Sequence, residues 1–462
     1  MADPFKILVP EIAFDTGTVI FRYVVPGFGD FEERVVFPRP LPTGPAITRL
    51  ANAAACVIGT SYFKLAPAAA IAIDMPLSPP LLALAEDTYT HGLGEFYVRN
   101  GLAFPPDISL TAPPGDDNGS HRDAQAPSGA IVAFGGGKDS HVAADLLARA
   151  GIDAEPVSVI LAEKVGSRLS GMLDGDLTFI RRTIDPRLIA LGRAGRGLNG
   201  HIPITAINSV LLTLFAAATG RAQVVFANER AASSPTIKLE TGTEVNHQHS
   251  KSLGYEALLR AVFDAVPGLD VDYFSILRPT SELWTIRYLV DHCPGALRTF
   301  ASCNRNFVFE GPSALAEDRN WCLTCSKCVY TAVLLATKMG PDRLKSVMGG
   351  NPFEIADNTL HLEKLSGILP VKPWECVGEI EEIAAALDRI YKTPAWAGLP
   401  VLDAVEPAFR RRWPNSAALE KRYDASFALA GENFIPRVLR EECPKAFRDG
   451  ECCRQSRTDC PP

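Results

Sequence analysis

The sequence lacks any uninterrupted apolar run of the ~18–20 residues that a helix needs to cross a bilayer. Its start, Met1-Ala2-Asp3-Pro4, also lacks the basic segment followed by an apolar segment that marks a secretory signal. We therefore expect a cytoplasmic protein with no membrane partner.

The chain also lacks an excess of positive charge. Its 46 lysines and arginines are outnumbered by 53 aspartates and glutamates, which gives a net charge of −7. Nucleic acids are held mainly through contacts of lysine and arginine with phosphate, and no large basic patch occurs in the sequence. We expect no nucleic-acid partner. Eleven cysteines are present, and without a secretion signal they are expected to be free thiols or metal ligands rather than disulfides.

The composition is not that of a disordered chain, because 47% of the residues are hydrophobic and only 21% are charged. A chain of 462 residues is long enough for two or three domains. Residues 1–110 predict a small N-terminal α+β module, with strands around 5–9, 19–25 and 32–37 and two helices after them. Residues 111–128 are rich in proline, glycine and polar residues and predict a linker.

From residue 129 the pattern changes to short apolar runs that alternate with helical segments, which is typical of a parallel α/β sheet. The runs are Ala130–Phe134, Val157–Leu161, Leu177–Ile184, Val224–Ala227 and Tyr273–Leu277. We expect this α/β core to cover 129–340. A mainly helical region is expected over 341–442, with 380–390 as its clearest amphipathic helix, and a disordered tail over 443–462.

The strongest local signal is a glycine loop between a strand and a helix. The strand 130–134 leads into Gly135-Gly136-Gly137-Lys138-Asp139-Ser140, and a helical pattern follows over 141–150. Glycines let a backbone approach phosphate oxygens closely, and the free N–H groups at a helix start attract anions. The spacing is neither that of a Walker loop nor that of a Rossmann turn. The loop is thus a candidate phosphate site, and the alternative is a turn that only closes a β–α unit.

This loop resembles the S-G-G-x-D-S loop of the PP-loop ATP pyrophosphatases, the superfamily of asparagine synthetase and GMP synthetase. The resemblance implies an adenine nucleotide α-hydrolase-like core that binds ATP and Mg²⁺. It implies that Asp139 is a magnesium ligand and that the pyrophosphate is held by Gly135, Gly136, Gly137, Lys138, Asp139 and Ser140. Gly135 stands where that superfamily has its first serine.

Four cysteines form a second candidate site. Cys322, Cys325 and Cys328 have C-x-x-C-x-x-C spacing, and Cys303 lies upstream of them. Four thiolates are what a closed tetrahedral zinc site requires, and 7-cyano-7-deazaguanine synthase has a similar arrangement. The alternative is that these thiols pack as small core residues on a helix.

Polar residues follow the apolar run 224–227 and recur about twenty residues later. Glu229 and Arg230 come directly after that run, and the later segment Glu244–Ser252 contains His247, His249 and Lys251. Arg230 and Lys251 are candidates for binding phosphate or carboxylate. The two histidines and Glu229 are candidate acid–base groups. The alternative is a solvated loop, and His201, at the start of an apolar helix, is either a cap residue or a ligand.

Taken together, the motifs resemble those of the MurL family, the UDP-N-acetyl-α-D-muramoyl-L-alanyl-L-glutamate epimerases of peptidoglycan synthesis. The resemblance extends over residues 5 to about 340. It is carried by residues 31–38, 92–97, 135–140, 228–233, 244–252 and 321–328.

This resemblance implies an ATP-dependent epimerase that adenylates the terminal L-Glu of UDP-MurNAc-L-Ala-L-Glu, inverts its Cα and hydrolyses the adenylate to the D-Glu product, AMP and diphosphate. A downstream ligase is an expected partner. Three alternatives remain open. The first is an epimerase of another peptide's C-terminal residue in natural-product biosynthesis, the second a PP-loop ligase or amidotransferase, and the third a non-catalytic nucleotide sensor.

Overall fold

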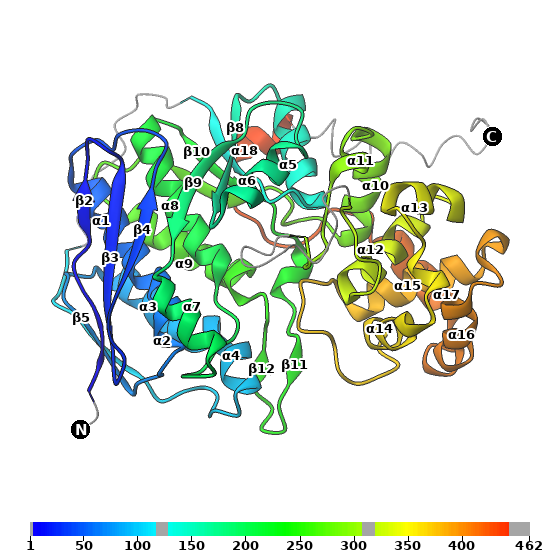
Figure 1. Ribbon diagram of the computed structural model, residues 1–462. Helices are drawn as coiled ribbons and strands as arrows, with labels where there is room; N and C mark the ends of the chain where they lie inside the picture. The colour runs from blue at the N-terminus through cyan, green and yellow to red at the C-terminus, as the bar shows by residue number, and fades with distance from the viewer. Residues whose placement is uncertain (1–2, 117–127, 307–318, 443–462) are drawn as a thin grey trace.

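The computed structural model describes residues 3–116, 128–306 and 319–442 (Figure 1). The tail expected over 443–462 lies outside the described residues, as does most of the linker expected over 111–128. All the strands and helices that the sequence predicted by residue range are present, with ends that differ by at most a few residues. The α/β class is thereby confirmed.

Five parallel strands form the part of the sheet that carries the glycine loop. They are β7 (Ala130–Ala133), β8 (Ala154–Ile160), β9 (Thr178–Thr183), β10 (Gln223–Phe226) and β13 (Asp272–Ser275). Their order in the sheet is β13-β10-β7-β8-β9, so the direction of winding reverses between β7 and β10. Open α/β sheets bind ligands in the crevice at the carboxyl ends of the strands at such a reversal.

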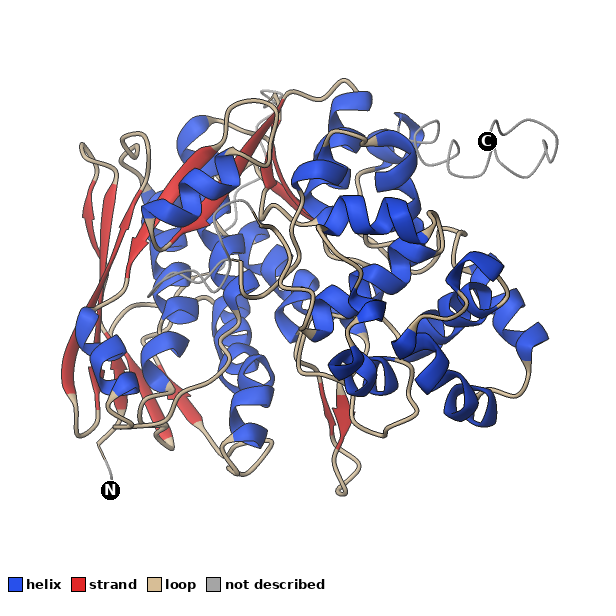
Figure 2. Ribbon diagram, turned by 45° about the vertical axis from the view of Figure 1, so that its right-hand side comes forward, coloured by secondary structure: helices blue, strands red, loops and turns tan. Residues whose placement is uncertain are grey.

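The N-terminal strands extend this same sheet. They are β1 (Phe5–Ile7), β2 (Glu11–Ala13), β3 (Thr18–Val25), β4 (Gly29–Val36), β5 (Ala70–Ile73) and β6 (Ser109–Thr111). Strand β4 pairs antiparallel with β9, with Val35 opposite Arg182. These six strands and the five parallel strands therefore form one eleven-stranded sheet. This sheet continues through the boundary expected near residue 110 (Figures 1 and 2).

The two faces of the parallel strands belong to two different hydrophobic cores. In β7, Ala130 and Val132 pack into one core and Ile131 into the other, as the period of two in a strand requires. The core around Ile131 includes residues of α1 (Pro45–Ile58), α3 (Pro79–Thr90), α8 (Ile204–Thr219) and α9 (Leu253–Asp264). The core around Val132 includes residues of α5 (Lys138–Arg149), α10 (Glu282–His292) and α12 (Ser326–Ala336).

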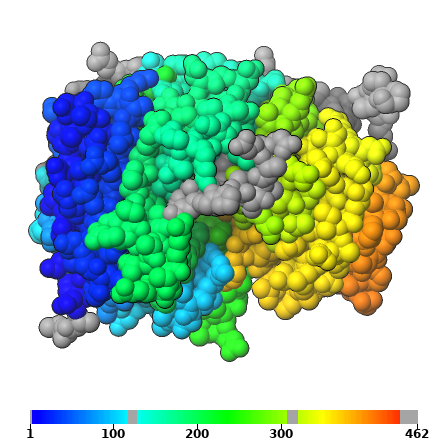
Figure 3. Space-filling model, viewed as in Figure 1, coloured from blue at the N-terminus to red at the C-terminus, as the bar shows by residue number. Residues whose placement is uncertain are grey.

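The C-terminal helices gather around α12, at the end of the molecule opposite the N-terminal strands (Figures 1 and 3). They are α13 (Pro341–Met348), α14 (Thr359–Leu365), α15 (Ile380–Tyr391), α16 (Pro400–Arg412) and α17 (Ser416–Ala425), whereas α18 (Arg437–Glu442) lies apart from this group (Figure 1). Their apolar residues continue the core around Val132. The mainly helical C-terminal region is thus present as expected.

The remaining elements are short. They are α2 (Thr60–Phe63), α4 (Gly94–Arg99), α6 (Glu163–Ser170), α7 (Pro186–Arg193), α11 (Ala296–Thr299) and the two-stranded ribbon of β11 (Ile237–Lys238) and β12 (Glu244–Val245). Among the residues described, no helix combines the length and the apolar character that a membrane crossing demands.

Candidate active site

A polar pocket lies where the winding of the sheet reverses. The glycine loop follows β7, and Asn228 and Glu229 follow the neighbouring strand β10. The pocket is lined by Lys138, Asp139, Ala227, Asn228, Glu229, Ala232, Gln248, Lys251, Glu282, Ser302, Lys327, Tyr330, Thr331 and Cys376. Residues from both strand ends, from α10, from α12 and from the C-terminal region therefore meet at one point.

The glycine loop has the conformation that its sequence requires. Gly136 has a φ of 71°, in the left-handed region that favours glycine, and its carbonyl accepts a hydrogen bond from the Ala301 N–H. Helix α5 begins immediately afterwards at Lys138. The Ser140 hydroxyl donates to the Gly137 carbonyl at 3.0 Å. The pocket thus opens beside a helix N-terminus, where an anion is favoured.

Lys138 is buried among three carboxylates. Its Nζ lies 2.6 Å from Glu229 Oε1 and 2.5 Å from Glu282 Oε2, and it also contacts Asp139. Burial opposes the charge on Lys138, but the carboxylates outweigh this effect and hold its pKa well above the ordinary value. Burial, reinforced by Asp139 and Glu282, raises the pKa of Glu229 well above its usual range. The cluster therefore favours a positive charge on Lys138 and disfavours a further negative charge on Glu229.

The same carboxylates form a set that fits Mg²⁺. One oxygen each of Asp139, Glu229 and Glu282 lies within 4.8 Å of the others, and Mg²⁺ prefers oxygen ligands of this kind. Burial opposes the charge on Asp139, but the Lys138 ammonium outweighs it and lowers the pKa of Asp139 to about 2. A negative ligand is thus available beside the first turn of α5.

The other side of the pocket holds a cysteine between two lysines. Lys251 Nζ lies 3.2 Å from the Cys376 Sγ, and Lys327 Nζ donates to the Cys376 carbonyl at 2.8 Å. Burial opposes the charge on the thiol, but Lys251 and then His247 outweigh it and hold the pKa of Cys376 well below its usual range. Cys376 thus lines the pocket in surroundings that favour its thiolate form.

Behind this cysteine stands a chain of polar contacts. His247 Nε2 lies 3.8 Å from the Cys376 Sγ, and His247 Nδ1 contacts the Glu95 carboxylate. Burial opposes protonation of His247, but hydrogen bonds to Cys376 and Glu95 raise its pKa to about 9. His201 Nδ1 lies 3.4 Å from Glu95 Oε2 on the other side. His201 thus contacts this carboxylate, and the residue at the N-cap position of α8 is Pro203.

The structure separates the residues predicted as catalytic. Glu229 and Lys251 line the pocket, and His247 reaches it through Cys376. His249 instead pairs with Asp87 at 2.6 Å and lines a different cavity. Arg230 does not line the pocket, and its side chain approaches Gly431.

Several pocket residues were missed by the sequence analysis. Glu282 begins α10 shortly after β13 ends, so the rule that found Glu229 also applied to it. Lys327 lies inside the cysteine motif. Glu95, which contacts His247 behind the pocket, lies inside the segment 92–97. Cys376 is a single cysteine in a loop of the C-terminal region and gave no sequence signal.

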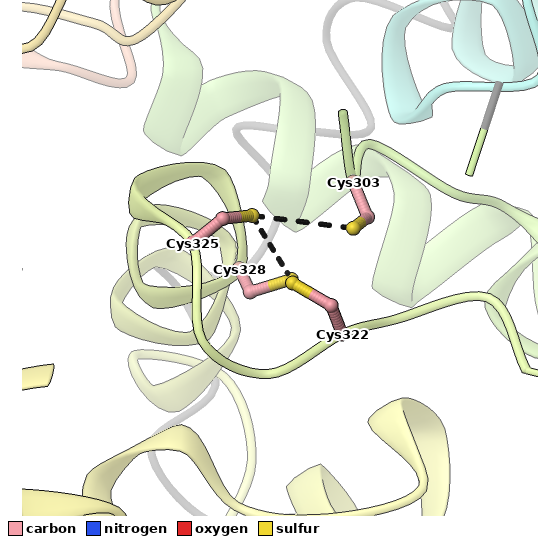
Figure 4. Close-up of side chains that lie close together, drawn as sticks. All are labelled: Cys303, Cys322, Cys325 and Cys328. Atoms are coloured by element: carbon pink, nitrogen blue, oxygen red, sulfur yellow. Dashed lines mark hydrogen bonds between the residues drawn. The ribbon is translucent and has the colours of Figure 1, made fainter. Parts of the chain in front are cut away.

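The four predicted cysteines converge as a closed cluster (Figure 4). The Sγ–Sγ distances are 4.0 Å for Cys303–Cys325, 3.7 Å for Cys322–Cys328 and 3.5 Å for Cys325–Cys328. A tetrahedral zinc site with Zn–S bonds of about 2.3 Å places its sulfurs about 3.8 Å apart. All four are free thiols. The geometry therefore fits Zn²⁺ better than the alternative of cysteines that pack independently in a core.

This cluster also positions one wall of the pocket. Cys325 caps the start of α12, and Cys328 lies in its first turn. Lys327, Tyr330 and Thr331 of the same helix line the pocket. Whatever holds the cysteines together therefore also holds these pocket residues in place.

Comparison with known proteins gives a consistent result over nearly the whole chain. The MurL N-terminal domain family matches residues 1–276, and the MurL C-terminal domain family matches residues 299–420. No solved structure matches the chain.

Three curated relatives carry the name UDP-N-acetyl-alpha-D-muramoyl-L-alanyl-L-glutamate epimerase. The relative from Salinispora tropica is 35% identical over 446 residues, covering 92% of this chain and 93% of its own. The one from a Micromonospora species is 33% identical, covering 94% and 96%. The one from Xanthomonas oryzae pv. oryzae is 35% identical, covering 85% and 84%.

Proposed function

This chain belongs to the MurL family, and we propose that it is an ATP-dependent epimerase that converts the terminal L-Glu of UDP-MurNAc-L-Ala-L-Glu into D-Glu. The single observation that carries the ATP dependence is the junction of the glycine loop with Glu229 and Glu282 at the reversal of the sheet. This position is where α/β sheets bind their ligands, and the loop ends in a helix N-terminus suited to phosphate.

The proposed chemistry explains why ATP is needed. An α-hydrogen beside an ionised carboxylate is hard to remove, because the carbanion forms next to an existing negative charge. Joining the carboxylate to AMP removes that charge and creates an electron sink. The substrate oxygen attacks the α-phosphorus, pyrophosphate departs, the Cα proton is removed and returned on the other face, and water then releases AMP.

The described residues divide these tasks between the two sides of the pocket. Lys138 and the N–H groups at the start of α5 neutralise the departing pyrophosphate. Asp139, Glu229 and Glu282 would hold Mg²⁺, which supplies charge neutralisation for the phosphates when bound. Lys251, on the opposite side, stabilises the negative oxygen that develops when the Cα proton leaves.

The experiment that tests this proposal is deuterium incorporation at the terminal glutamate Cα in D₂O, run with and without ATP. We expect incorporation, D-Glu product, AMP and pyrophosphate only when ATP is present. Incorporation without ATP would contradict the adenylate route.

The same assay separates the remaining alternatives. An amide formed on addition of ammonia would indicate a ligase or amidotransferase, and nucleotide binding without AMP release would indicate a sensor. Parallel assays with free dipeptides would show whether another peptide is the preferred substrate. The D-Glu product needs a further amino acid joined to it to extend the peptide, so a ligase is the class of partner that we propose.

A further inference from the structure

We propose that the thiolate of Cys376 is the base that removes the α-proton from the activated glutamate, with Lys251 and His247 holding it in its charged form. This inference rests on the proposed function and deepens it. None of the acid–base candidates chosen from the sequence included this residue.

The first argument is position. Cys376 lies between α14 and α15, yet it lines the same pocket as Lys138 and Asp139 of the glycine loop. Cys376 and Lys251 contact each other in the pocket wall at 3.2 Å. A substrate whose carboxylate meets the nucleotide at the loop therefore has a sulfur and an ammonium group within the same pocket.

The second argument is the set of charges around the sulfur. The groups that face Cys376 are Lys251, His247, Lys327 on α12, and Lys372 and Glu375 in its own loop. Four of the five are basic, and Lys251 and His247 both approach the Sγ itself. The Glu95 carboxylate on the far side of His247 holds the imidazole in its protonated form. Nucleophilic and basic cysteines are found in such electropositive, partly exposed surroundings.

The third argument is contrast with other thiols of the chain. Cys56 and Cys293 are buried away from the pocket, and burial raises the pKa of each to about 12. They are therefore neutral, inert core residues. Four further cysteines contact one another in the cluster of Cys303, Cys322, Cys325 and Cys328. Among the cysteines that the structure describes, Cys376 alone lines the pocket.

The step balances without any further reagent. The Cα–H bond breaks, its proton passes to the Cys376 Sγ, and the electron pair moves into a C=C bond as the acyl oxygen takes the negative charge. Lys251 is placed to stabilise that oxygen. A proton delivered to the opposite face gives the D centre, and the Cys376 thiol returns its proton to solvent.

The first test compares Cys376→Ser and Cys376→Ala with the full-length protein. We expect each variant to lose Cα deuterium incorporation by at least about 100-fold, the usual contribution of a general base. Each should still catalyse exchange of labelled pyrophosphate into ATP when the dipeptide substrate is present. Incorporation at the unchanged rate would overturn the role of Cys376. Failure of the unmodified protein itself to exchange would instead overturn the proposed function.

The second test reads the thiolate directly, without turnover. The rate of Cys376 alkylation by iodoacetamide, followed by peptide mass spectrometry, should stay high well below the ordinary thiol pKa of about 8.5. Lys251→Met and His247→Gln should each move the midpoint upward, whereas His249→Gln, on the other polar cluster, should not. A midpoint near 8.5 in the unmodified protein would overturn the inference.

A thiolate at this position could alternatively attack the acyl group and form a thioester. That outcome is distinguished by quenching the protein with acid during turnover and analysing it by mass spectrometry before and after treatment with hydroxylamine, which cleaves a thioester. A substrate-sized adduct on Cys376 would overturn the role as a base. Its absence, together with the loss of deuterium incorporation in Cys376→Ala, supports the inference.

Discussion

The pocket residues carry unusual charge states because they are buried together. Lys138 is only 4% exposed, and a buried ammonium is tolerated only when partners compensate for the lost water. Here three carboxylates do so, which leaves a net negative site before any ligand binds. Such a site favours a divalent cation, and the cation in turn favours the phosphates.

Replacing Asp139 tests this arrangement. In Asp139→Ala we expect pyrophosphate exchange and Mg²⁺-dependent turnover to fall by at least about 100-fold, because a charged ligand beside Lys138 is lost. The folded state should persist, as judged by circular dichroism. Asp145→Ala on the same helix, where the carboxylate pairs with Arg149, is the matched control and should retain the exchange rate. Unchanged activity in Asp139→Ala would remove this loop from the mechanism.

His201 gives a pH prediction. Burial, assisted by the charge on His247, lowers the pKa of His201 to about 4, whereas a histidine in the unfolded chain titrates near 6.5. Between these values the unfolded chain binds a proton that the folded protein does not. The stability that the neutral ring contributes is therefore present above pH 6.5 and is lost as the pH falls toward 4.

His201→Gln removes this titration. The unmodified protein should lose about 2–3 kcal/mol more unfolding free energy than the variant when the pH is lowered from 7.5 to 4.5. Urea unfolding of both proteins at the two pH values measures the difference. A stability difference that does not change with pH would contradict the assignment.

The sequence predicted those pocket residues that come directly after a predicted strand. Glu229 follows the strand β10, and Lys138 and Asp139 follow β7, so their meeting could be inferred from parallel pairing. Cys376 could not be found in this way, because its loop reaches the pocket only through the packing of α12, α14 and α15. Likewise, no local pattern distinguishes His247, at the pocket, from His249, at Asp87.

At the scale of elements, α12 links the cysteine cluster to the pocket. Its first turn contains Cys328 and also Lys327, whose ammonium donates to the Cys376 carbonyl. The C-x-x-C spacing predicted a metal site, and the sulfur distances fit one. The spacing could not predict that the same helix forms a wall of the pocket, since this depends on where α12 packs against α10 and α15.

Removing one thiol tests that link. In Cys322→Ser we expect bound zinc to fall well below one equivalent per chain by elemental analysis, because three thiolates no longer close the tetrahedron. Pyrophosphate exchange should fall as well, because the start of α12 loses its anchor. Cys56→Ala, which removes a thiol buried in α1, is the control and should keep its zinc. Full activity in a zinc-free Cys322→Ser protein would show that the cysteine cluster is not needed to position the pocket residues of α12.

At the scale of the molecule, one sheet joins the N-terminal module and the α/β core, which the sequence analysis had treated as separate parts. The composition changes sharply around residues 111–128, and this change suggested a boundary. The pairing of β4 with β9 cannot be read from composition, because it joins strands about 150 residues apart. A buried ion pair crosses the same seam, with Arg182 Nε 2.7 Å from Glu33 Oε1.

Glu33→Ala tests how firmly the two parts are joined. Arg182 is fully buried, so removing its partner leaves a charge without compensation, and we expect a loss of about 3–5 kcal/mol in unfolding free energy. The neighbouring Glu32→Ala, whose side chain is exposed and pairs with Arg22, should cost less than about 1 kcal/mol. Urea unfolding measures both. Equal effects would mean that the seam contributes little.

The pocket draws Lys138, Glu229, Lys251 and Cys376 from separate parts of the chain. The glycine loop alone is therefore not the site, because Glu229 and Glu282 follow it in the chain and Cys376 follows them. A fragment that ends before α10 lacks both Glu282 and Cys376, so it cannot contain the complete pocket.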